Sequence, residues 1–191
     1  MSTLAGSETE KNVLAAFLNE SADQNRYLYY AKVAKKAGYV ALSLVFEETA
    51  LQERSHAKSF FKYLEDGKLT INTTFHKGQL GDNMENLIQA VERETEQYTT
   101  LYPKYAEVAK TEGFPKIATL FSSIARAERY HAARFRSFID AIERGTVFKD
   151  DRKVMWVCSK CGYVHEGSSA LETCPACGHP KAYFERTDLL S

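Results

Sequence analysis

A Glu-x-x-His motif that occurs twice, each time inside an apolar helical stripe, is the feature that most constrains the fold of this chain. Glu53 and His56 form the first copy, and Glu128 and His131 form the second. A spacing of three residues places the carboxylate and the imidazole of each copy on one face of a helix. Around the second copy that face is otherwise apolar, with Ile117, Phe121, Ile124, Phe135, Phe138 and Ile142. Buried carboxylates are too costly unless they are protonated, paired or bound to cations, so the motifs predict a shared internal site.

The sequence around these motifs predicts four long helices. Ser7 with Glu10 and Asp82 with Glu85 form capping-box patterns at the starts of the first and third helices. We expect helices over residues 7–38, 40–65, 82–113 and 115–144, a connection over 68–81, and a linker over 146–151. The expected fold class is therefore mainly α, a four-helix bundle with one long crossover.

The two halves of the helical region resemble each other at an offset of 75 positions. Residues 31–38 match residues 106–113. At the same offset, five residues of the first half fall on identical or similar residues of the second: Tyr27 on Tyr102, Phe46 on Phe121, Glu53 on Glu128, His56 on His131, and Phe60 on Phe135. Glu20 corresponds to position 95, but the glutamate is Glu94, so one extra residue lies before Tyr102. We predict that a π-bulge or a kink at Pro103 absorbs it.

Two further glutamates interrupt apolar faces and complete a set of metal ligands. Glu20 does so on the first helix and Glu94 on the third. Together with the two Glu-x-x-His copies they form the six-ligand set of di-iron carboxylate bundles. Four carboxylates carry a charge of about −4, which two divalent ions neutralise, and oxygen-rich ligation with imidazole suits iron or manganese.

Three more residues lie beside this predicted site, and the sequence leaves their roles open. Gln97 lies one turn after Glu94 and either faces the site or is a surface or capping amide. Tyr27 and Tyr102 either donate hydrogen bonds to ligand carboxylates or simply pack in the core.

All four cysteines lie near the end of the chain, and the first 157 residues contain none. They form two Cys-x-x-Cys pairs, each followed by glycine: Cys158 with Cys161, and Cys174 with Cys177. This pattern strongly predicts a tetrahedral metal site, with iron and zinc both open. Trp156, Tyr163 and Phe184 are expected to form a small aromatic core around it.

Composition excludes several kinds of partner. The chain has 191 residues, with 25 basic and 25 acidic side chains, so charge gives no reason to expect nucleic acid or an anionic membrane. The first residues are polar, without the apolar core of a signal peptide, and no stretch is long and apolar enough to span a bilayer. We therefore expect a soluble cytoplasmic protein.

With a carboxylate bundle followed by a four-cysteine tail, the sequence resembles the rubrerythrin family over essentially its whole length. The residues that carry the resemblance are Glu20, Glu53, His56, Glu94, Glu128 and His131 in the bundle and Cys158, Cys161, Cys174 and Cys177 in the tail. The resemblance implies a ferritin-like four-helix bundle over residues 1–148 that holds a non-haem di-iron site. It also implies a rubredoxin-like domain over residues 149–191 with an iron–tetrathiolate site, for which zinc is a possible substitute.

The resemblance also implies a function. The family's usual role is that of a peroxidase, which reduces hydrogen peroxide to water as an oxidative-stress defence, and the six bundle ligands would be its catalytic residues. Members are homodimers in which the tetrathiolate iron of one subunit lies near the di-iron site of the other. Electrons arrive through rubredoxin or an NAD(P)H-dependent reductase. Two alternatives remain: a ferroxidase or iron-storage protein, and a tail that is a zinc scaffold for protein binding.

The third helix departs from the family pattern. That helix usually reads Glu-x-x-Glu in the family, and its second glutamate is an iron ligand that exchanges with the histidine of the second helix on reduction. Here the pair is Glu94 and Gln97, and a neutral amide is a poorer ligand for Fe(III) than a carboxylate. We therefore predict that His56 keeps its iron in both redox states or that water takes the vacant position.

Overall fold

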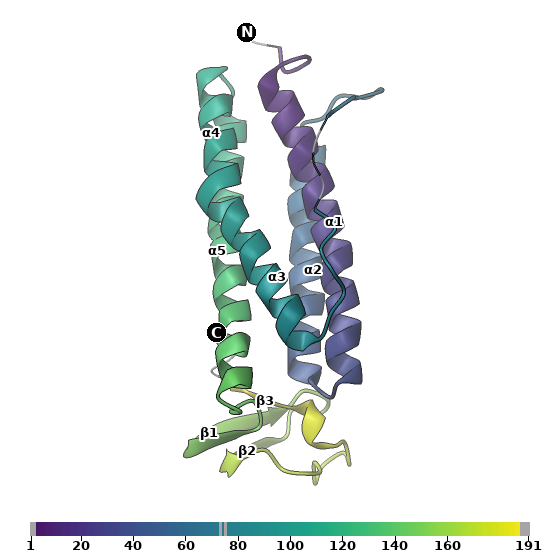
Figure 1. Cartoon of the computed structure of the whole chain (residues 1–191), viewed down its shortest axis with the longest axis vertical. Coiled ribbons are helices and arrows are strands. Elements are labelled where there is room, and N and C mark those ends of the chain that lie inside the picture. Colours follow the sequence, from purple (N-terminus) through teal and green to yellow (C-terminus); the bar gives the residue numbers. More distant parts are fainter. Residues whose placement is uncertain (1–2, 73, 75, 188–191) are drawn as a thin grey trace.

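The structure, a computed structural model, describes residues 3–72, 74 and 76–187 of the chain. It contains a bundle of long helices with a small sheet at one end (Figure 1). The helical elements of the bundle are α1 (Glu8–Lys36), α2 (Val40–Phe61), α3 (Asn83–Glu96), the π-helical turn η1 (Gln97–Leu101), α4 (Tyr102–Thr111) and α5 (Pro115–Glu143). Helix α1 packs chiefly against α2, and α5 packs against α3 and α4. The described part of the connection between α2 and α3 runs beside α1 toward the sheet end of the bundle (Figure 1). The predicted mainly α fold is confirmed.

Local hydrogen bonds explain where the helices begin and end. The Ser7 hydroxyl accepts from the backbone N–H of Glu10, and Asp82 and Glu85 form the predicted capping box. Helices α1 and α5 end within two residues of their predicted ends. Helix α2 ends at Phe61 rather than at position 65. The backbone N–H groups of residues 63 and 64 donate to carbonyls three residues earlier, as in a 3-10 turn, instead of four residues earlier as in an α-helix.

The third predicted helix, over residues 82–113, is interrupted. The backbone N–H of Tyr102 donates to the carbonyl of Gln97, a five-residue bond that replaces the four-residue bond of an α-helix. The π-helical turn η1 therefore absorbs the extra residue. Of the two predicted alternatives, a π-bulge and a kink at Pro103, the structure has the first. Pro103 follows directly in the first turn of α4, where its missing N–H breaks no bond of that helix.

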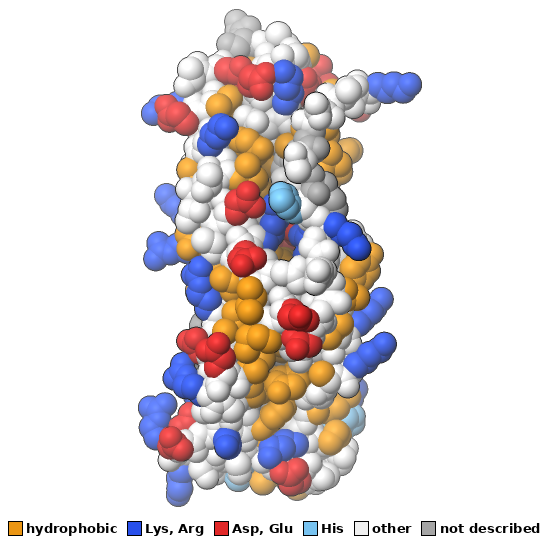
Figure 2. Space-filling model, in the orientation of Figure 1, with side chains coloured by type: hydrophobic (Ala, Val, Ile, Leu, Met, Phe, Trp, Pro, Cys, Tyr) orange, Lys and Arg blue, Asp and Glu red, His pale blue; other side chains and the backbone are white. Residues whose placement is uncertain are grey.

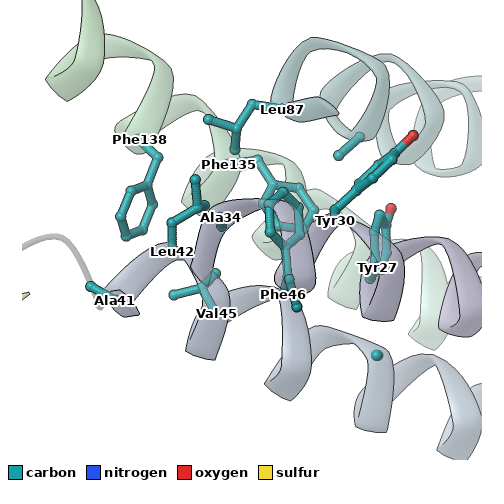
Figure 3. Packing of buried hydrophobic residues seen from close by; sticks show 13 residues of the cluster. Tyr27, Tyr30, Ala34, Ala41, Leu42, Val45, Phe46, Leu87, Phe135 and Phe138 are labelled. Atoms are coloured by element: carbon teal, nitrogen blue, oxygen red, sulfur yellow. The ribbon is translucent and has the colours of Figure 1, made fainter. Parts of the chain in front are cut away.

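Two apolar clusters fill the bundle, one on either side of its middle. Figure 3 shows the cluster nearer the sheet, in which aromatic rings from three helices meet: Tyr27, Tyr30, Phe46, Phe135 and Phe138. The other cluster lies toward the far end and includes Val13, Phe60, Tyr102, Phe121 and Ile124. The buried glutamates lie between these clusters on their helices, so the polar site is enclosed by apolar packing at both ends.

The four-cysteine tail folds as a small antiparallel sheet. Its strands, in the order β2-β1-β3, are β1 (Lys149–Cys158), β2 (Val164–Ser169) and β3 (Phe184–Arg186), with a 3-10 turn, η2 (Lys181–Tyr183), before the last. Trp156 and Phe184 are fully buried in it and Tyr163 packs against them, as predicted. The predicted linker over 146–151 is partly wrong, because Lys149 already pairs with Ser169 in the sheet.

The division of the chain at residues 148 and 149 remains a prediction; strand β1 begins at Lys149. Within the described ranges, no helix is long and apolar enough to cross a membrane.

Candidate metal centres

Four helices carry the six predicted bundle ligands to one place in the middle of the bundle. Glu20 comes from α1, Glu53 and His56 from α2, Glu94 from α3, and Glu128 and His131 from α5. All four glutamates are at most 1% exposed, so water cannot solvate their charge. The structure thus brings together every bundle residue that the sequence singled out as a metal ligand.

One group of ligand atoms surrounds the ring of His56. Its Nδ1 lies 3.1 Å from Glu53 Oε2 and 3.1 Å from Glu128 Oε1. The same nitrogen lies 3.4 Å from Glu20 Oε2. Three carboxylates from three helices therefore face a single imidazole nitrogen.

A second group surrounds His131. Its Nδ1 lies 3.0 Å from Glu53 Oε1 and 2.8 Å from Glu128 Oε2. Glu94 Oε2 lies 3.7 Å from the same nitrogen. In each of the two groups, the ligand atoms all lie within 4.8 Å of one another.

Glu53 and Glu128 belong to both groups, and each places one oxygen on either side. Glu53 turns Oε2 to His56 and Oε1 to His131, while Glu128 does the reverse. Two carboxylates that bridge two positions, each completed by one histidine and one further glutamate, are the donor set of a di-metal site.

Burial and the charge of neighbouring carboxylates raise the pKa of Glu20 and of Glu94. Burial, together with the nearby charge of Glu53, raises the pKa of Glu20 to about 8. Burial and the charge of Glu128 raise the pKa of Glu94 to about 7. Both groups therefore hold protons that a bound cation displaces near neutral pH.

The pKa values of the two histidines are also raised, although burial by itself acts to lower them. Burial acts to lower the pKa of His56, but the close carboxyl groups of Glu128, Glu20 and Glu53 raise it to about 12. The pKa of His131 also lies well above its usual range, because surrounding carboxylates outweigh the same effect of burial. Each imidazole must lose its proton from Nδ1 before that atom can bind a metal.

The residues fit a pair of metal ions, because several buried carboxylate oxygens and one imidazole nitrogen, all atoms that can bind a metal, have no hydrogen-bond partner. Within the described part of the chain these include Glu20 Oε2, Glu53 Oε1, Glu94 Oε2, both oxygens of Glu128, and His131 Nδ1. Buried acceptors without a partner are costly, and a cation between them removes the cost. Carboxylate oxygen with imidazole nitrogen suits iron or manganese.

Tyr27 and Tyr102, whose roles the sequence left open, both pack in the core and both reach the site. The hydroxyl of Tyr27 donates to Glu94 Oε1, and the hydroxyl of Tyr102 donates to Glu20 Oε1. Each tyrosine thereby leaves the other oxygen of its glutamate for the centre. The two bonds are related by the internal repeat, since these tyrosines occupy equivalent positions.

Two polar residues at the site were not predicted from the sequence. Gln52 Oε1 lies 2.9 Å from Nε2 of His131 and accepts from it when that nitrogen carries the proton, which leaves Nδ1 for a metal. Asp23 is 1% exposed and lies one helical turn after Glu20, on the same face of α1. That spacing was the signal for Asp23, whereas Gln52 contacts a residue 79 positions away and no local pattern predicts it.

The four cysteines converge on a second centre of different chemistry. Sulfur atoms lie 3.8 Å apart in Cys158 and Cys177 and 3.7 Å apart in Cys161 and Cys174, much too far for disulfide bonds. All four lie within 4.8 Å of one another.

The turns around these cysteines stabilise negative charge on the sulfurs. The backbone N–H groups of Tyr163 and His179 donate to the sulfurs of Cys161 and Cys177, which acts to lower the pKa of each thiol, while burial and neighbouring thiols raise both pKa values overall. Gly162 and Gly178, with φ of 75° and 72°, allow the chain to turn in this way. Four convergent thiolates are the ligand set of tetrahedral zinc or iron.

Comparisons with known proteins identify the family. The family model described as Rubrerythrin matches residues 11–139, and the model of the rubrerythrin rubredoxin-like domain matches residues 156–185. The chain belongs to the rubrerythrin family. The rubrerythrin of Nitratidesulfovibrio vulgaris is 50% identical to it over 185 residues, which is 97% of either chain. That of Porphyromonas gingivalis is 46% identical over 183 residues, which is 96% of this chain and 92% of the relative.

Solved structures agree with this assignment. Nigerythrin in its partially reduced state gives a TM-score of 0.62 at 28% identity and covers 95% of this chain and 90% of its own. The structure described as fully reduced, all-ferrous nigerythrin gives 0.61 at 26% identity, over 97% and 92%. Symerythrin from Cyanophora paradoxa gives 0.63 at 20% identity, over 75% and 89%, a likeness in fold alone.

Gln97 is the departure from the rubrerythrin pattern that the sequence indicated, and it is not a surface amide. It is 1% exposed at the start of η1, and its Nε2 lies 3.4 Å from the hydroxyl of Tyr102, which in turn donates to Glu20. Gln97 therefore lies beside the Glu20 side of the site. That His56 keeps its metal in both redox states, or that water takes the vacant position, remains a prediction.

Proposed function

We propose that this chain is a non-haem di-iron peroxidase that reduces hydrogen peroxide to water, with electrons delivered through an iron–tetrathiolate centre. One observation carries the proposal: a buried site with two bridging carboxylates and a site of four convergent thiolates occur in the same chain. The carboxylate site suits a reaction with an oxygen species, and the thiolate site suits transfer of single electrons.

The ligands divide among three irons. Glu20 and His56 would hold one iron of the pair, Glu94 and His131 the other, with Glu53 and Glu128 between them. The four cysteines would hold the third iron. The nigerythrin structure described as fully reduced and all-ferrous, at 26% identity, supports iron over manganese and zinc.

When bound, the iron pair supplies two electrons that, with two protons, convert one hydrogen peroxide into two water molecules, and the tetrathiolate iron restores the electrons singly. The protein itself encloses the site and orients the metal ligands. The apolar clusters on both sides keep bulk water from the site. Tyr27 and Tyr102 fix the orientation of Glu94 and Glu20 through their hydroxyl groups.

The arrangement of the two centres supports a homodimer. The stretch of α5 between His131 and its end at Glu143 alone measures about 18 Å, and the cysteine sheet begins only beyond it. Large apolar side chains are exposed on the outer faces of α1 and α2, among them Leu28, Tyr29, Leu44 and Leu51. A second copy placed on this surface would bury them and could bring its thiolate iron near the carboxylate site.

Rubredoxin or an NAD(P)H-dependent reductase is the electron donor we propose, because Cys161 is exposed and offers a point of entry to the thiolate centre. Cysteines kept as thiolates rather than disulfides suit the reducing cytoplasm, where we place the protein.

Anaerobic rapid mixing tests the proposed function. The fully reduced protein is mixed with hydrogen peroxide and, separately, with dioxygen, and oxidation of each centre is followed by visible absorption. We expect the carboxylate site to be oxidised faster by peroxide, with the thiolate iron oxidised afterwards. Faster oxidation by dioxygen, with iron retained as a mineral, would instead establish a ferroxidase or storage protein, which the ferritin-like bundle also permits.

Metal analysis tests the thiolate centre independently. Iron bound by four cysteines is coloured and zinc is not. A colourless, zinc-loaded protein from iron-supplemented cells would remove the electron relay from the proposal and make the tail a scaffold.

A further inference from the structure

Asp23 is a buried carboxylate beside the metal site that does not belong to either group of ligand atoms. It lies on α1, one turn after Glu20. Its Oδ2 accepts hydrogen bonds from Arg93 Nε, at 3.1 Å, and from Gln97 Nε2, also at 3.1 Å. Its Oδ1 accepts from Arg26 Nη1. The carboxylate thus joins two cations and one amide of the site.

The two arginines separate Asp23 from water and neutralise it. Their side chains are 11% and 15% exposed, whereas that of Asp23 is 1% exposed. Arg26 and Arg93 line a hollow of about 220 Å³, and Figure 2 shows acidic and basic side chains gathered around a hollow on this face. Arg26 also donates to the backbone carbonyl of His76, which ties this arginine to the segment before α3. Asp23 is therefore held in one position by partners on both of its oxygens.

The contacts of Asp23 determine which end of the Gln97 amide faces it. A carboxylate engaged with two guanidinium groups only accepts hydrogen bonds, so the Gln97 atom 3.1 Å away must be the NH₂ group. The NH₂ group also lies 3.4 Å from the hydroxyl of Tyr102. The carbonyl oxygen of Gln97 is left buried, with no donor among the residues that the structure describes.

We propose that Asp23 is a positioning residue that orients the Gln97 amide so that its carbonyl oxygen is available to the cation held by Glu20 and His56. The proposal rests on the proposed di-metal centre. A neutral oxygen at this position leaves the four glutamates to balance two divalent ions. A flipped amide would offer N–H groups, which cannot bind a cation.

A carboxylate in place of Gln97 would lie directly beside Asp23. Two carboxylate oxygens 3.1 Å apart would repel each other in a site that excludes water. The carboxylate of Asp23 is therefore compatible with the neutral amide of Gln97, which can donate a hydrogen bond to it.

Anaerobic titration with Fe(II) against a chromophoric chelator tests the role of Asp23. In Asp23→Asn the new side-chain NH₂ can donate to the Gln97 carbonyl oxygen, which then competes with the metal. Gln97→Leu removes that oxygen. We expect each variant to bind the weaker Fe(II) of the pair about 10- to 100-fold less tightly than the wild type. The double variant should bind like Gln97→Leu alone, because Asp23 acts through Gln97. Mössbauer spectra of ⁵⁷Fe should show one of two iron environments changed.

Asp140→Asn is the matched control, since Asp140 is exposed on α5 and pairs with Arg144 at the helix surface. It should bind Fe(II) like the wild type. If Asp23→Asn melts at a lower temperature but keeps both iron affinities and spectra, Asp23 is only a structural ion-pair partner and the proposal is wrong. If Asp23→Asn does not fold, unchanged Fe(II) binding by Gln97→Leu overturns the proposal by itself. A wild type that binds no pair of Fe(II) ions would refute the proposed centre instead.

Discussion

Raising the pH should destabilise the metal-free bundle and strengthen its binding of metal ions. The physical reason is that folding raises the pKa of Glu20 to about 8 and that of Glu94 to about 7, from an ordinary value of 4.5. Both groups are buried, so bulk water screens neither shift. The perturbation is a change of buffer from about pH 5 to about pH 8, a range that brackets the two shifted values.

The sign and the size follow from proton linkage. Between pH 4.5 and the raised pKa, the folded state keeps a proton on each carboxyl group that the unfolded chain has released. The free energy of unfolding therefore falls as the pH rises, by about 1.4 kcal/mol per pH unit for each group. This contribution is fully present below pH 4.5 and is lost by about pH 8. His56, whose pKa rises from 6.5 to about 12, adds a loss of the same sign above pH 6.5.

Urea denaturation of chelator-treated protein at a series of pH values measures this dependence. Glu20→Gln should flatten the slope by about 1.4 kcal/mol per pH unit, because one titrating group is gone. The exposed control Asp140→Asn should leave the slope unchanged. With Fe(II) added anaerobically the slope should weaken or reverse, because metal binding releases the same protons. A metal-free protein whose stability is constant or rises between about pH 5 and pH 8 would refute this account of the site.

Three further predictions test separate parts of the molecule. Tyr102→Phe removes the hydroxyl that donates to Glu20 and should weaken Fe(II) binding by about 10- to 100-fold in anaerobic titrations, whereas unchanged binding would make Tyr102 a packing residue. Phe135→Ala should cost about 3–5 kcal/mol in urea denaturation, since the ring is fully buried against Tyr27 and Phe46; a loss below about 1 kcal/mol would contradict the packing. Cys174→Ser should abolish the visible absorption of the thiolate iron and spare the bundle iron, and metal analysis would show otherwise if the two sites were coupled.

Much of the fold followed from local patterns in the sequence. Capping residues such as Ser7 and Asp82 marked the helix starts because the cap bonds join neighbours three residues apart. The register of the internal repeat predicted either a π-bulge or a kink at Pro103, since an extra residue must be absorbed without moving Glu94 off the buried face, and the structure has the π-helical turn. The start of β1 at Lys149 was not predictable in this way, because the partner Ser169 lies beyond the cysteine turn.

The candidate site shows the same division between local and distant contacts. The two Glu-x-x-His copies were predictable because the spacing of three residues places both side chains of each copy on one face of its own helix. Two of the three partners of Asp23, Arg93 and Gln97, lie 70 and 74 positions away, and Gln52 lies 79 positions from His131. None of these three contacts leaves a periodic signal, so they became visible only in the folded chain.

The charges around Gln97 explain how a departure from the family pattern fits this buried site. Replacing a carboxylate by an amide at this position removes one negative charge from the ligand set. Asp23 supplies a carboxylate close by, but it pairs with both Arg26 and Arg93, so it adds no net negative charge to the centre. With fewer anionic donors, an iron pair bound here would be stabilised less in its ferric state than one bound by five carboxylates. Such a site would favour the ferrous pair, which is the form that the proposed reaction with peroxide consumes.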